Sequence, residues 1–146
     1  MKELDSQDAR IEAIIDDENK NLNVGDAVEK FYVQLARCLQ LPCNVTSIED
    51  FRWEEGYVFG AGDSEEYREL RKSQPSYKDT FELLAIERDT YSEWMMFYGE
   101  DLVGKVRRKS DGKEFYLGLA EIEVMDKKSE NYQLLDDYSV WFVNNR

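Results

Sequence analysis

The sequence predicts an α+β fold: N-terminal helices, then a small twisted antiparallel sheet or SH3-like barrel, then a C-terminal helix. Three observations support this. Apolar residues recur at helical spacing over residues 26–39, and they do so again at the end of the chain. Between these segments, Asp111-Gly112 separates two strand-like stretches, which is typical of a hairpin. Helices followed by strands and a last helix favour the α+β class.

Length and composition predict one domain over residues 1–146. The chain is 42% hydrophobic and 13% aromatic, which is enough to form a core. Within this domain, residues 1–24 are expected to form a loosely packed N-terminal helix.

Two helices are expected before the sheet. The first spans about residues 8–18 and has a thin apolar face of isoleucines. The second spans residues 26–39, where apolar side chains three and four positions apart form one face. Asp26 follows a glycine and is a candidate N-cap, and Pro42 ends the helical pattern.

The middle of the chain predicts short elements. Residues 45–59 indicate a strand followed by a loop, which the glycines of residues 60–62 interrupt. A short helix is expected over residues 63–72, because Asp63 and Glu66 have the spacing of a capping box.

The second half of the chain predicts the sheet and the last helix. Strands are expected at residues 81–87, 102–109 and 113–124. The closing stretch, NYQLLDDYSVWFVNNR, has aromatic and apolar residues at helical spacing and is expected to pack on the sheet.

Net charge and residue types exclude several classes of function. A formal charge of −13 repels nucleic acid and anionic membranes and attracts cations or basic proteins. The basic segment KVRRKSDGK contains no interleaved aromatic residue, so a nucleic-acid site is not expected. The chain has no histidine and no phosphate-binding or nucleophile motif, so we expect no enzyme. No apolar run is long enough for a membrane span or a signal peptide, which predicts a cytoplasmic protein.

The acidic residues do not form an EF-hand. In a twelve-residue loop starting at Asp17, the sixth position requires glycine but holds Leu22. The twelfth position requires a bidentate glutamate but holds Val28. The loop would lack both the sharp turn and one major ligand.

A looser acidic cluster is a better candidate metal site. Residues 49–69 contain eight acidic and two basic residues, arranged on both sides of a glycine-containing turn. If the segment folds back on itself, carboxylates from both sides of the turn could converge on an ion. The spacing alone instead favours acidic side chains that are solvated at the surface, together with a helix cap. The candidate ligands are Asp50, Glu54, Glu55, Asp63, Glu65 and Glu66, with Asp137 of the last helix as an outside candidate.

Three segments together resemble the CcbP family of small acidic bacterial proteins. They are FYVQLARCLQLPCNVTSI, VRRKSDGKEFYLGLAEIEVMD and QLLDDYSVWFV, in the same order as in the family and covering most of the chain from about Phe31 onward. Asp137, Tyr138 and Trp141 match the family's Asp-aromatic-x-x-Trp ending.

This resemblance implies reversible Ca²⁺ binding through surface carboxylates without an EF-hand. It also implies a role as a calcium buffer or a signal-linked calcium store. The alternative is an interaction module whose acidic face docks a basic partner protein or mimics nucleic acid.

Overall fold

The computed structural model describes residues 6–15, 23–60, 64–88, 92, 94 and 101–145. Within these residues, the helices are α1 (Ser6–Ile15), α2 (Val24–Cys38), α3 (Glu55–Phe59), α4 (Ser64–Leu70) and α5 (Glu130–Asn145), with short 3₁₀ turns η1 (Arg52–Glu54) and η2 (Leu119–Glu121). The strands are β1 (Cys43–Ser47), β2 (Thr80–Glu87), β3 (Val103–Arg108), β4 (Glu114–Gly118) and β5 (Ile122–Val124).

The strands form one antiparallel sheet in the order β4-β3-β2-β1-β5. The sheet is open, so of the two predicted forms the described strands make the twisted sheet and not a closed barrel. The predicted α+β class, with helices before the sheet and one after it, is confirmed.

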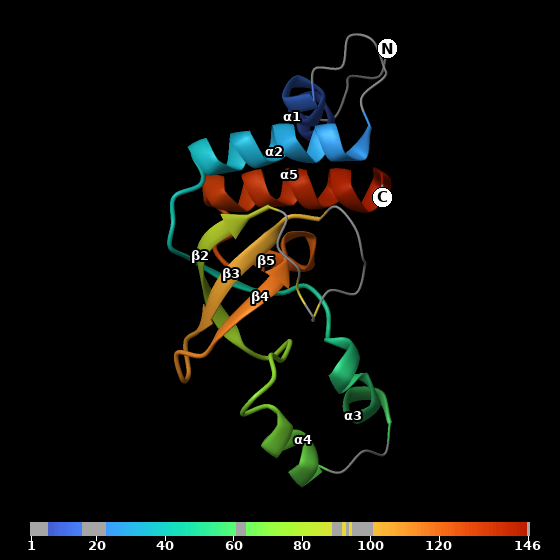
Figure 1. Ribbon diagram of the computed structural model, residues 1–146, viewed down its shortest axis with the longest axis vertical. Helices are drawn as coiled ribbons and strands as arrows, with labels where there is room; N and C mark the ends of the chain where they lie inside the picture. Colours follow the sequence, from blue (N-terminus) through green and yellow to red (C-terminus); the bar gives the residue numbers. More distant parts are fainter. Residues whose placement is uncertain are drawn as a thin grey trace.

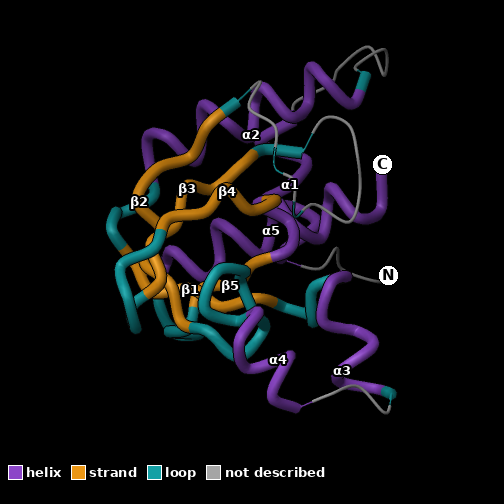
Figure 2. The backbone as a smooth tube through the Cα atoms, turned by 60° about the horizontal axis from the view of Figure 1, so that its bottom comes forward, coloured by secondary structure: helices purple, strands orange, loops and turns teal. Residues whose placement is uncertain are grey.

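Helices α2 and α5 lie side by side and cover the sheet, with α1 packed beyond them (Figure 1). The short helices α3 and α4 lie next to each other at the opposite end of the molecule (Figure 2). No helix in the described ranges combines the length and the apolar composition needed to cross a bilayer.

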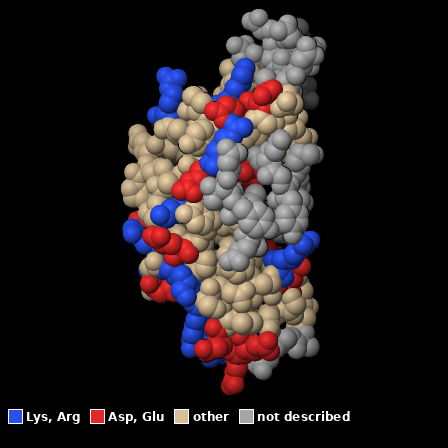
Figure 3. All heavy atoms as spheres, viewed as in Figure 1, with Lys and Arg blue, Asp and Glu red and all other residues tan. Residues whose placement is uncertain are grey.

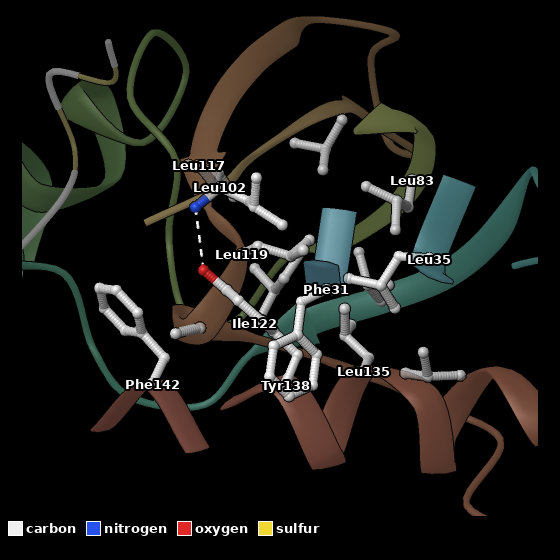
Figure 4. Packing of buried hydrophobic residues seen from close by; sticks show 14 of the residues in the cluster. Phe31, Leu35, Leu83, Leu102, Leu117, Leu119, Ile122, Leu135, Tyr138 and Phe142 are labelled. Carbon is white, nitrogen blue, oxygen red and sulfur yellow. Dashed lines mark hydrogen bonds between the residues drawn. The ribbon is translucent and has the colours of Figure 1, made fainter. Parts of the chain in front are cut away.

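The core lies between the two long helices and the sheet. Phe31 of α2 packs edge-on against Tyr138 of α5, with ring centroids 5.4 Å apart. Leu35 of α2, Leu83 of β2 and Ile122 of β5 close around these rings (Figure 4). The helical spacing that predicted both helices therefore marks the faces that they bury.

The expected N-cap of α2 was wrong by three positions. Asn23, not Asp26, occupies the N-cap, and its side-chain oxygen accepts a hydrogen bond from the Asp26 N–H at 2.8 Å. Both residues have the short polar side chain that N-caps favour, so sequence alone did not separate them.

Arg108 of β3 holds the loop that follows α4. Its guanidinium is 2% exposed and lies 2.9 Å from Asp79 and 2.8 Å from Asp111. It also donates to the backbone carbonyls of Arg71, Lys72 and Gln74. The buried guanidinium thus pairs with two carboxylates and with three backbone carbonyls that follow α4. A buried charge needs such partners to offset its lost hydration.

We expect Arg108→Met to lower the free energy of unfolding by about 3–5 kcal/mol, because among the described residues it leaves the buried charge of Asp79 with the Ser76 N–H at 2.9 Å and a single cation, Arg71, at 3.4 Å. Urea unfolding at pH 7 measures this loss. The neighbouring Arg107→Met is the control, since Arg107 is exposed and pairs only loosely with Glu82 at 3.4 Å. Equal losses in the two variants would contradict the assigned role of Arg108.

The ion pair between Arg108 and Asp111 predicts that the stability of the fold depends on pH. Hydrogen bonds from Arg108 lower the pKa of the Asp111 carboxyl from 3.8 to about 2. The unfolded chain therefore binds this proton more tightly, so the stabilisation is present above about pH 4 and is lost as the pH falls toward 2. In urea unfolding between pH 4 and pH 2, the wild type is expected to lose more stability than Asp111→Asn. Parallel profiles would show that this pair contributes nothing.

Candidate functional site

Glu54, one of the predicted ligands, is fully buried and fully hydrogen-bonded. Glu54 is 0% exposed to solvent. One carboxylate oxygen accepts the backbone N–H groups of Phe51 and Tyr77, at 2.9 and 2.8 Å. The other accepts the hydroxyls of Tyr67 and Ser76, at 2.9 and 2.8 Å. Four donors occupy both oxygens, so this carboxylate joins η1 to α4 and to the loop before β2.

Asp137 has a similar structural role on α5. Arg10 of α1 donates to both of its oxygens, at 2.8 and 3.0 Å, and Gln7 donates to one of them at 3.0 Å. The two-pronged contact with Arg10 is the strong geometry for an arginine and a carboxylate. Asp137 therefore holds α1 against the last helix.

The remaining candidates of the α3–α4 segment lie nearer the surface. Glu55 is half-buried at the start of α3, and Glu65 and Glu66 are exposed on α4, at the end of the molecule where acidic side chains gather in Figure 3. Asp63 lies outside the described residues. The Tyr57 hydroxyl of α3 donates to Glu66 at 2.7 Å, so the two arms do fold against each other.

Asp50 faces a different part of the molecule. It is half-buried in the loop after β1 and lines a cavity of about 390 Å³ bounded by that loop, η2 and α5. Within the described part of the chain, its Oδ2 atom is buried and has no hydrogen-bond partner. Glu49, Asp101, Glu121 and Asp136 line the same cavity.

A second residue that lines this cavity also has a buried oxygen without a partner among the described residues. Ser139 of α5 is 7% exposed, and its Oγ has no hydrogen-bond partner among the described residues. Buried polar atoms in folded proteins are nearly always hydrogen-bonded. The residues lining this one cavity thus include two buried oxygens without a hydrogen-bond partner in the described chain, which makes it the candidate site.

Asp101 is positioned by the core. The Tyr138 hydroxyl, reaching from α5, donates to Asp101 and accepts the backbone N–H of Leu102 at 3.0 Å (Figure 4). Burial, together with the nearby charge of Asp101, raises the pKa of the Tyr138 hydroxyl far above its usual range. The hydroxyl stays protonated at neutral pH, so it remains a donor to this carboxylate.

Gly118 lets two carboxylates approach each other. A Cβ atom placed on Gly118 would lie 2.7 Å from Glu121 Oε2 and 2.9 Å from Asp101 Oδ2. Both oxygens thus face the same small space at the end of β4. Asp50 lines the same cavity from the loop after β1 and Asp136 lines it from α5, so four separate segments contribute acids.

Of the polar residues that line the cavity, the sequence predicted Asp50 as a ligand and did not select Asp101, Glu121 or Ser139. Asp101 precedes β3 and Glu121 ends η2, and each has just one acidic neighbour within two positions, Glu100 and Glu123, so neither stood out as part of a dense acidic cluster. Their only sequence signal is the hairpin between them, which brings the two ends of the strand pair together. The described residues contain no group of three or more Asp, Glu, Cys or His side chains already arranged around a common metal position.

Comparison with known proteins gives two similar folds. The sequence matches no protein-family model and no curated protein. The structure is similar to the crystal structure of Anabaena CcbP, with a TM-score of 0.59 and 15% identity, covering 97% of this chain and 93% of that one. It is also similar to a protein described as a calcium-binding protein in the calcium-binding form, with a TM-score of 0.58 and 17% identity, covering 94% and 90% of the two chains.

These matches extend over almost the whole chain, and their identities are too low to show more than the fold. The resemblance that the sequence segments suggested is confirmed at that level: the protein has the CcbP-like fold.

Proposed function

We propose that this protein binds Ca²⁺ at the acidic end of the cavity, with Asp50, Asp101 and Glu121 as carboxylate ligands and Ser139 as a hydroxyl ligand. The observation that supports the proposal most directly is the pair of buried oxygens, Asp50 Oδ2 and Ser139 Oγ, that have no partner in the described chain. Calcium prefers oxygen ligands, and every polar side-chain group named here offers oxygen.

The carboxylates are not yet at coordinating distance from one point, so binding requires them to close on the ion or to share it with water molecules. Calcium tolerates both, since its coordination is flexible and commonly includes water. The CcbP-like fold, found in a protein described in a calcium-binding form, also supports this proposal.

Of the seven ligands predicted from the sequence, the proposal keeps Asp50. Glu54 and Asp137 already have hydrogen-bond partners on both oxygens, which gives them a role in the fold without an ion. The exposed Glu65 and Glu66 add to the negative field that attracts the cation. In this proposal the protein acts as a cytoplasmic calcium buffer or signal-linked store and not as an enzyme. Docking of a basic protein partner stays a prediction.

Asp50→Asn is expected to weaken calcium binding by at least about tenfold, because the number of charged ligands sets the affinity of such sites. Calorimetry in about 0.1 M KCl, repeated with magnesium, measures the effect and its selectivity. Glu65→Gln removes an equal charge from the exposed surface of α4 and is the control. An equal loss in the control would move the site to α4, and no saturable heat from the wild type would overturn calcium binding itself.

Gly118→Ala tests the geometry of the site without changing its charge. The added methyl group would displace the carboxylates of Asp101 and Glu121, so we expect calcium affinity to fall by about tenfold. Gly56→Ala is the matched control, because nothing lies within 4 Å of a Cβ placed there. Equal calcium affinities for the two variants would contradict a site above Gly118.

A further inference from the structure

The cavity is larger and more apolar than a calcium ion requires. Its volume of about 390 Å³ falls in the range of small-molecule sites. Hydrophobic side chains from the loop after β1, from η2 and from α5 form most of its wall: Ile48, Phe51, Ala120, Val140, Phe142 and Val143. An ion held by the carboxylates leaves this apolar lining unexplained.

The charged residues that line the cavity are acidic. Among the described residues, five carboxylates and no lysine or arginine line the cavity: Glu49, Asp50, Asp101, Glu121 and Asp136. The buried Asp50 Oδ2 and Ser139 Oγ are both able to accept a hydrogen bond, and neither has a donor in the described chain. A buried acceptor without a donor is costly, so a ligand with N–H groups would relieve both atoms.

We propose that this cavity binds a small organic cation: an ammonium group carried on an apolar chain or ring. The ammonium group would lie among the carboxylates and donate to Asp50 and Ser139, and the apolar body would lie against Phe142 and Val143. Carboxylates repel an anionic ligand, and a neutral one lacks the charge that they attract. The inference goes beyond calcium binding and does not require it, although both ligands use the same carboxylates.

The test compares three molecules of the same shape: 4-phenylbutylamine, 4-phenylbutan-1-ol and 4-phenylbutyrate. Each is titrated into the ¹⁵N-labelled full chain, in a buffer with EGTA at pH 7, and followed by amide NMR shifts. We expect the amine to saturate one site with a dissociation constant of about 1 mM or below. The shifts are expected near Ser139 and in the loop after β1. The alcohol is expected to bind at least about tenfold more weakly, and the acid not at all.

A matched pair of variants locates the site. Val143 and Val33 are both 46% exposed and both lie on long helices, but only Val143 lines the cavity. Val143→Lys brings its own ammonium group to the carboxylates and is expected to abolish amine binding, whereas Val33→Lys leaves it unchanged. Because both positions are exposed, both variants are expected to fold, and their amide spectra verify this.

Three results would overturn the inference: no saturable shifts with the amine, equal affinity for the alcohol, or unchanged amine binding in Val143→Lys. Calcium is titrated separately into the protein without amine. Calcium binding without amine binding defeats the organic-cation site alone, and amine binding without calcium binding defeats the proposed function alone.

Discussion

The hydroxyl of Tyr138 is the interaction on which both the fold and the site depend. It is buried among Phe31, Trp141 and Phe142, where an unsatisfied hydroxyl would be costly. It meets this requirement by accepting the Leu102 N–H and donating to Asp101. The same contacts fix the start of β3 against α5. A requirement of the core therefore places a carboxylate at the edge of the cavity and holds it there.

Hydrogen-bond partners separate three structural acids from Asp50, although Asp101 also accepts from the Tyr138 hydroxyl and from the Ala120 N–H at 3.3 Å. Glu54, Asp79 and Asp137 are buried, and each has an arginine or several donors on its carboxylate. Such acids gain little from a metal ion, because binding one would require breaking those bonds. Asp50 differs, since one of its oxygens is buried without a donor in the described chain. In a chain with a net charge of −13, this distinction says more about cation binding than the density of acidic residues does.

Much of the fold could be predicted from the sequence, because it rests on local signals. Helical spacing marked α2 and α5, and Asp111-Gly112 marked the β3–β4 hairpin, where Gly112 has a positive φ of 78°. The site depends instead on tertiary contacts. Asp101 and Glu121 approach each other only because β3 and β4 pair antiparallel between them. Three of the four donors to Glu54 come from residues 13 to 23 positions away, so its acidic neighbours in the sequence suggested a metal ligand where the structure has a buried, hydrogen-bonded carboxylate.

The two cations proposed for the cavity would be selected by different forces. Calcium brings two charges and no apolar surface, so its binding would rest on the carboxylates and weaken as salt screens them. An organic ammonium brings one charge, and burial of its apolar body adds about 25 cal/mol for each Å² removed from water. Because both need Asp50, each lowers the apparent affinity for the other, and thermodynamic linkage makes this effect reciprocal. Rising ionic strength would therefore shift the balance toward the organic ligand, whose apolar contribution is not screened.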